Sequence, residues 1–164
     1  MKYISIAILS FLLMACGGAK TIAQKNYIKA VNKEEISLEK EWISYSRGFC
    51  FGTCPVFEMT IYKDGSVLYR GKANVPQVGT YYGQLSKNQI EKLEEGLEKY
   101  NILTTPEDLL DKMIMDVPTI NLRVVTKGNV HHIKHNAGGA ENVKAYEKVV
   151  EAIINSVDLK IVEQ

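Results

Sequence analysis

RGFCFGTCP, residues 47–55, is the stretch around which the sequence is organised. It places Cys50 and Cys54 four positions apart in a loop that contains two glycines and ends in a proline. Glycine and proline at such spacings favour turns over regular secondary structure. The stretch therefore predicts a tight loop between two strands, because strand-like sequence lies on both of its sides.

Apolar and polar residues alternate before and after this loop. Residues 42–46 place Ile43 and Tyr45 on one face, and residues 56–62 repeat the alternation. A period of two residues is typical of a strand with one buried face. We expect these two segments to pair as neighbours in one sheet.

The second strand is followed by a turn that ends in Gly65. A three-residue loop with Gly65 at positive φ pairs Ile61 with Val67, whereas a two-residue loop places Arg70 opposite the core residue Met59. Only the first arrangement keeps the arginine off the buried face. The sequence therefore predicts the three-residue loop.

Two amphipathic helices follow later in the chain. Ser86 is the expected N-cap of the first, with Gln89 completing a capping box. Its apolar stripe consists of Ile90, Leu93, Leu97 and Tyr100. The stripe of the second helix consists of Val143, Tyr146, Val150, Ile153 and Val157. Stripes of this spacing indicate helices that pack on a sheet.

The remaining segments are less regular. Residues 78–84 predict a strand at an edge or with a bulge, because they contain two glycines. Residues 101–118 contain two prolines and are expected to be irregular, apart from one helical turn near Leu109-Leu110. Residues 119–136 predict a hairpin with a two-residue turn at Gly128-Asn129, which places Ile133 opposite Val124.

These elements predict an α+β fold, with an antiparallel sheet of about five to six strands and two helices on one face. We expect a single domain over residues 41–158, followed by a tail at 159–164. An apolar content of 46% and interspersed charges fit a globular domain of this size.

The N-terminus predicts export. Residues 1–15 combine Lys2 with an apolar run too short to span a bilayer, as in a signal peptide. Leu13-Met14-Ala15-Cys16 resembles a bacterial lipobox, which implies cleavage before Cys16 and its lipidation. The expected partner is then a membrane, reached through Cys16 and a tether over residues 16–40. Gly17 is not the aspartate associated with inner-membrane retention, which favours the outer membrane.

Cleavage before Cys16 would also determine the net charge of the mature chain and the number of cysteines that can form a disulfide. Removing Lys2 leaves 19 basic against 19 acidic residues, so no basic footprint for nucleic acid remains. With Cys16 lipidated, Cys50 and Cys54 remain as a pair in an oxidising compartment, where a disulfide is expected. A redox centre is the alternative, although the spacing is one residue longer than Cys-x-x-Cys.

Several motifs together resemble the domain of unknown function 6438, found in exported bacterial proteins and lipoproteins. They are CFGTCP at 50–55, Asp64-Gly65 with Val67, Tyr69 and Gly71, the helix start at Leu85-Ser86, and DVPT at 116–119. The resemblance covers about Ile43 to Val157. It implies a fold unit and a cellular location, and it implies no reaction.

The sequence predicts no catalytic residue, metal site or cofactor. His131 and His135 share a strand face roughly 13 Å apart, too far to bind one zinc ion, and His132 faces the opposite way. We expect all three to lie exposed or at the hairpin edge. No serine lies in a nucleophile elbow. Asp116 more often accepts turn hydrogen bonds than acts in catalysis.

The candidate recognition surface is Arg47 with Phe49 and Phe51. Large apolar residues in an exposed loop either pack inward, our first expectation, or meet a partner. We therefore expect a non-catalytic, lipid-anchored envelope domain that binds an unknown envelope protein or polymer or assists envelope assembly. The alternatives are a thiol-disulfide oxidoreductase that uses Cys50 and Cys54, and an inhibitor that presents the 50–54 loop to a protease or lytic enzyme.

Overall fold

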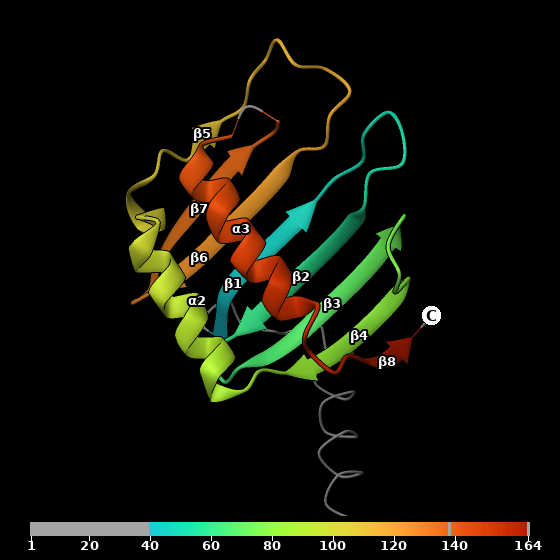
Figure 1. The fold of residues 1–164 in the computed structure, drawn as a ribbon, viewed down its shortest axis with the longest axis vertical. Helices are drawn as coiled ribbons and strands as arrows, with labels where there is room; N and C mark the ends of the chain where they lie inside the picture. Colours follow the sequence, from blue (N-terminus) through green and yellow to red (C-terminus); the bar gives the residue numbers. More distant parts are fainter. Residues whose placement is uncertain (1–39, 138, 164) are drawn as a thin grey trace, which may run out of the picture. The chain divides into compact units, whose positions relative to one another are not determined.

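A computed structural model describes residues 40–137 and 139–163. The expected signal peptide, the expected lipidation site Cys16 and the expected tether up to residue 39 lie outside the described residues. The described part is an α+β domain (Figure 1), whose elements are β1 (Glu41–Arg47), β2 (Val56–Tyr62), β3 (Ser66–Ala73), β4 (Gly79–Gln84), α2 (Lys87–Lys99), η2 (Ile102–Thr104), β5 (Asp108–Leu109), β6 (Ile120–Thr126), β7 (Asn129–His135), α3 (Glu141–Ile154) and β8 (Lys160–Glu163).

The strands form one eight-stranded sheet in the order β5-β7-β6-β1-β2-β3-β4-β8. Neighbouring strands are antiparallel except β5 and β7, which run parallel. The expectation of an antiparallel sheet of about five to six strands is therefore only roughly right. The two additional strands, β5 and β8, have only two and four residues and lie at the two edges.

The hairpin of β2 and β3 has the predicted register. Ile61 pairs with Val67 and Met59 pairs with Tyr69. Gly65 has a φ of 78°, a left-handed conformation that glycine adopts without steric cost. The prediction of a three-residue loop is confirmed.

The hairpin of β6 and β7 differs from its prediction by two residues. Ile133 pairs with Leu122, and Val124 pairs with His131. The turn is Lys127-Gly128, with φ of 48° and 83°, which fits a type I′ turn. A shift of two residues keeps every side chain on its expected face, so Ile133 remains fully buried.

Two expectations for irregular segments are also corrected. The segment near Leu109 forms β5 instead of a helical turn, because it hydrogen-bonds beside the end of β7. β4 is not an edge strand, because β8 pairs with it from the segment expected to be a tail. The register between β4 and β8 shifts between Thr80 and Tyr81, which fits the other predicted outcome for this glycine-containing strand, a bulge.

Both helices lie on one face of the sheet, as predicted (Figure 1). Ser86 caps α2, and the capping box with Gln89 is present. Leu93 and Tyr146 are fully buried in the shared core, and the Tyr146 hydroxyl donates a hydrogen bond to the Leu93 carbonyl. Within residues 40–137 and 139–163, no helix is long and apolar enough to cross a membrane.

Candidate functional site

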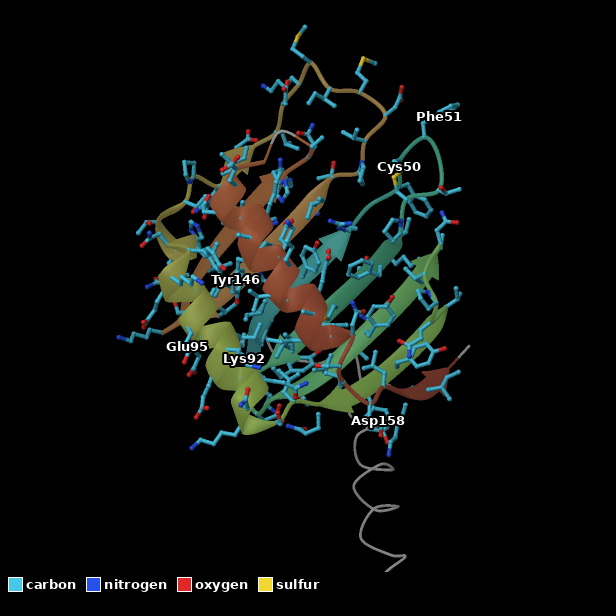
Figure 2. All side chains as sticks on the ribbon, viewed as in Figure 1. Cys50, Phe51, Lys92, Glu95, Tyr146 and Asp158 are labelled. Carbon is cyan, nitrogen blue, oxygen red and sulfur yellow. A yellow bond between two sulfur atoms is a disulfide. The ribbon has the colours of Figure 1, made fainter. Side chains whose placement is uncertain are left out.

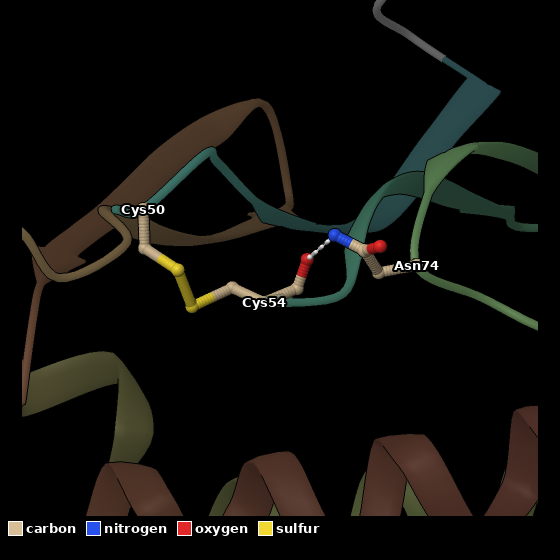
Figure 3. The surroundings of a disulfide bond; sticks show 3 residues. All are labelled: Cys50, Cys54 and Asn74. Atoms are coloured by element: carbon tan, nitrogen blue, oxygen red, sulfur yellow. Dashed lines mark hydrogen bonds between the residues drawn. A yellow bond between two sulfur atoms is a disulfide. The ribbon is translucent and has the colours of Figure 1, made fainter. Parts of the chain in front are cut away.

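The loop between β1 and β2 is closed by a disulfide between Cys50 and Cys54, whose Cα atoms are 5.9 Å apart. The Asn74 side chain donates a hydrogen bond of 3.0 Å to the Cys54 carbonyl (Figure 3). Asn74 lies in the connection after β3, so this bond fixes the loop to the neighbouring hairpin. The loop is therefore held both by a covalent bond and by the sheet.

Phe49 and Phe51 point into solvent, with 72% and 89% of their surface exposed, and Phe51 lies at the end of the loop (Figure 2). The expectation that they pack inward is wrong. The sheet carries a row of aromatic rings of its own, one from each of four adjacent strands. The rings are Tyr45, Phe57, Tyr69 and Tyr81, with centroid distances of 5.6, 5.7 and 6.3 Å between successive members.

A second loop, residues 110–119, runs beside the disulfide loop at the same end of the sheet (Figure 1). The Phe51 amide donates to the Asp116 carbonyl at 3.2 Å, and the Gly48 amide donates to the Thr119 carbonyl at 2.9 Å. Asp116 is exposed and has a φ of 63°. The interaction of Asp116 with the disulfide loop thus uses its backbone rather than its carboxylate.

Arg47 belongs to a network beneath the disulfide loop and is not at its end. Its Nε donates to the Tyr45 hydroxyl at 2.9 Å, and its Nη2 lies 3.3 Å from Glu151 Oε1. The Tyr45 hydroxyl in turn donates to Glu151 at 2.7 Å. The network connects the end of β1 to helix α3.

The pKa values of this network fix its protonation. Burial, followed by the charge of Glu147, raises the pKa of Tyr45 far above its ordinary value, so its hydroxyl remains a hydrogen-bond donor. Burial alone would lower the pKa of Arg47, but Tyr45 and Glu151 raise it overall. A protonated phenol and a permanent cation suit a structural network, since neither can act as a base or a nucleophile.

His135 is fully buried, which corrects the expectation of an exposed histidine. Its Nε2 lies 2.6 Å from Glu147 Oε1, and its Nδ1 lies 2.8 Å from the Asn136 carbonyl. Burial alone would lower the pKa of His135, but the bonds to Glu147 and Asn136 outweigh burial and raise it. The raised pKa favours the doubly protonated ring, whose two nitrogens can donate to Glu147 and to the Asn136 carbonyl between β7 and α3.

The other two histidines make separate contacts. His131 Nδ1 lies 3.4 Å from Glu107, and His132 Nε2 lies 3.3 Å from Asn121. In the described part of the chain, no group of three or more His, Cys, Asp or Glu side chains is arranged to hold a metal ion. The three histidines therefore do not converge on one site.

Two hollows adjoin the Arg47 network. One of about 300 Å³ is bordered by Arg47, His135, Lys144 and Lys148, and one of about 190 Å³ is bordered by Tyr45, Phe57 and Glu151. The first lies at the lower limit of the roughly 300–1,000 Å³ that is usual for small-ligand cavities, and the second lies below it. A groove of about 870 Å³ lies between α2 and α3, bordered by charged side chains from both helices.

The sequence reasoning missed the apolar residues of the second loop. Met113 is 89% exposed, Ile114 37% and Met115 78%. Their exposure could have been predicted because the three apolar residues are consecutive. Such a run within an irregular and otherwise charged segment indicates exposed apolar side chains. Five of the large apolar side chains that the structure exposes therefore lie on two adjacent loops.

These features define a class of protein: a small α+β domain with one helix-covered sheet face and a disulfide-closed loop that exposes aromatic side chains. The chain belongs to the family described as a domain of unknown function, DUF6438, whose model matches residues 41–154. The match begins at β1 and ends with α3, so it covers both loops and the network beneath them. No curated protein matches the chain significantly.

Proposed function

We propose that this chain is a lipid-anchored, non-catalytic domain of the cell envelope that binds another envelope component through residues 48–54. The observation that carries the proposal is the exposure of Phe49 and Phe51 on a loop held in shape by the Cys50–Cys54 disulfide. Attachment through Cys16, with the outer membrane favoured, is part of the same proposal and derives from the N-terminal sequence.

Exposed aromatic residues on a rigid loop suit binding for two reasons. Aromatic side chains dominate the energetics of protein interfaces, because they bury a large area in a partner pocket. A loop that is already ordered loses little conformational entropy when it binds. The disulfide and the bond from Asn74 to Cys54 supply this order before any partner arrives.

The chemistry beneath the loop supports a non-catalytic role. Arg47, Tyr45 and Glu151 satisfy one another, and the raised pKa of Tyr45 keeps its hydroxyl protonated. His135 and Glu147 are paired and enclosed. Each of these groups stabilises the end of the sheet that supports the loop.

The test measures retention of the protein by envelopes. A soluble chain that starts at Gly17, and so lacks the lipidation site, is mixed with isolated envelopes and sedimented. We expect saturable retention, lost in the Phe49→Ser/Phe51→Ser variant and kept in Val130→Ser. Val130 is the matched control because it is an apolar residue, 48% exposed, on β7. Equal retention of all three proteins would contradict the proposal.

The same exposed loop also favours a second candidate, an inhibitor that inserts residues 50–54 into an enzyme. A disulfide-closed loop loses less conformational entropy when it enters a cleft than a flexible loop does. The binding proposal relies on the same advantage. This candidate predicts that the soluble chain inhibits an envelope protease or lytic enzyme in extracts and that Phe51→Ser abolishes the inhibition. Retention without inhibition would leave the simple binding function.

A further inference from the structure

The two loops together expose a group of apolar side chains, which we call the tip: Phe49, Phe51, Met113, Ile114 and Met115. The loops lie side by side at one end of the sheet (Figure 1), and backbone hydrogen bonds join them at Phe51–Asp116 and at Gly48–Thr119. A displacement of one loop would therefore break bonds to the other. The tip thus brings apolar side chains from two distant parts of the sequence to the same end of the sheet.

Hydrogen bonds hold the base of the second loop, just as the disulfide holds the first loop. The Asn136 side chain donates to the Asp111 carbonyl at 2.8 Å and accepts from the Asp111 amide at 3.1 Å. The Asp111 carboxylate accepts from the Met113 amide at 2.9 Å. These bonds fix the loop to the end of β7. The methionines are thus presented from an ordered backbone, while their own side chains remain adaptable.

The charge of the tip favours a protein partner over a lipid surface. Residues 48–55 carry no charge, and residues 110–117 carry Asp111, Lys112 and Asp116, which sum to −1. Arg47, at the base, is paired with Glu151. Segments that insert into anionic membranes are instead rich in lysine and arginine around their apolar residues. The tip lacks the positive charge that such a surface would attract.

The direction of β1 places the tip at the far end of this strand from the point where the chain enters the domain. The chain enters the domain at Lys40, and β1 then runs seven residues, roughly 20 Å, toward the disulfide loop. The tip therefore lies at the opposite end of β1 from the point of entry (Figure 1).

We infer that the tip binds a protein that offers an apolar cleft bordered by basic residues, and that residues 113–115 contact this protein together with Phe49 and Phe51. This inference rests on the proposed binding function of the disulfide loop. It adds the second loop and the chemical class of the partner. A cleft fits because the tip projects from the end of the sheet, and basic residues would complement Asp111 and Asp116.

The test places a photo-crosslinking amino acid at Phe51, at Met115 or at Val130 of the full chain in its own cells. Phe51 and Met115 should yield adducts with the same protein, and Val130 should yield none. Peptide mapping should locate both adducts in apolar segments flanked by lysine or arginine. Unlabelled soluble chain should compete for the adduct, whereas Met113→Ser/Met115→Ser should compete roughly tenfold less well, as expected for buried interface anchors.

A charge variant and a lipid assay complete the design. Asp116→Asn keeps a residue that tolerates positive φ and should weaken competition about two- to threefold, as expected for a peripheral charge. Vesicles of phosphatidylethanolamine and phosphatidylglycerol should not retain the soluble chain. Retention by these vesicles that Phe51→Ser abolishes would overturn the inference in favour of a lipid partner.

The outcomes also separate this inference from the function on which it rests. An adduct from Phe51 without one from Met115 would overturn the two-loop tip and leave the binding function of the disulfide loop intact. Absence of adducts at both positions, together with no retention by envelopes, would contradict both. An adduct mapped to an acidic segment would overturn the proposed chemistry of the partner alone.

Discussion

At the scale of single residues, His135 and Glu147 form the most enclosed polar pair in the described part of the chain. Their side chains are 1% and 4% exposed. A buried ion pair contributes little net stability compared with apolar residues of similar volume, but removing one partner leaves a buried charge without compensation. The pair therefore constrains β7 and α3 to one relative position, which supports the base of the 110–119 loop through the adjoining Asn136.

The first prediction concerns the loss of this pair. His135→Ala should lower the free energy of unfolding by about 3–5 kcal/mol, because Glu147 would remain buried and unpaired. The double variant with Glu147→Gln should recover part of the loss, since it removes the uncompensated charge. Urea denaturation measures both. Equal stability of His135→Ala and the native protein would contradict the role assigned to the pair.

The same pair predicts a dependence of stability on pH. The pKa of His135 is raised in the folded protein above the ordinary value of about 6.5 that it has when unfolded. Its contribution is therefore complete below pH 6.5 and is lost as the pH rises through the folded pKa. Unfolding free energies measured across this range should fall with pH in the native protein and fall less in His135→Gln. An unchanged slope in the variant would assign the dependence to other groups.

The orientation of Phe49 and Phe51 is the residue-level feature that the sequence could not decide. Phenylalanine is more often buried than exposed, which made inward packing the natural expectation. In the folded protein, Tyr45, Phe57 and Tyr69, from three different strands, pack against one another, while the loop exposes both phenylalanines to solvent. A local sequence pattern does not indicate how the side chains of a loop lie relative to distant strands.

At the scale of elements, the two hairpins show what local pattern can predict. The β2–β3 register was predictable because Gly65 marks the left-handed turn position and Arg70 excludes the alternative face. The β6–β7 register was misassigned because Lys127, a residue that rarely adopts positive φ, occupies the first turn position. The alternation predicted the buried face correctly in both cases.

The short edge strands were not predictable from their own residues. β5 has two residues and β8 has four, which is too few for a reliable alternation. Their strand conformation comes from the hydrogen bonds that β7 and β4 offer at the edges of the sheet. Both helices, in contrast, were predicted from their apolar stripes, because these stripes are long and face one core.

The next prediction concerns the contact between the helices. Gly96 is buried in α2, and a Cβ atom at this position would lie 2.7 Å from the Tyr146 ring. Gly→Ala normally stabilises a helix interior by about 1 kcal/mol. Here we expect Gly96→Ala to destabilise the protein by about 1–3 kcal/mol, because the fully buried ring cannot move without disturbing the core. Thermal unfolding measures the effect, and the penalty should shrink when Tyr146→Leu is combined with it.

The disulfide prediction separates a structural bond from a redox centre. Replacing Cys50 and Cys54 by serine should cost about 2 kcal/mol, because the bond closes a loop of only about five residues. Retention by envelopes should weaken as the loop loses its shape. A thiol-disulfide oxidoreductase would instead show turnover with an added dithiol and a thiolate pKa well below about 8.5. Such turnover in the native protein, absent in the variant, would contradict the binding proposal.

At the scale of the whole molecule, the family match leaves out the N-terminal segment to which we assign the anchor. The family match covers residues 41–154, and α3 and the last matched residue end together at Ile154. The match thus includes the core, the disulfide loop and the second loop, and it excludes Cys16. The fold and the tip should therefore not depend on the lipid.

The last prediction follows from this separation. Mass spectrometry of the native protein should find a mature N-terminus at Cys16 that carries acyl groups, because more than one chain is needed for stable membrane attachment. A Cys16→Ser chain exported with an ordinary cleavable signal in place of residues 1–15 should appear in the soluble fraction. Its unfolding free energy should match that of the native domain within about 0.5 kcal/mol, as for substitutions outside a folded core. If envelopes still retain the soluble variant through Phe51, the tip binds without the anchor. A mature N-terminus at another residue, without acyl groups, would contradict the anchoring part of the proposal. The tip would then be judged by its own experiments.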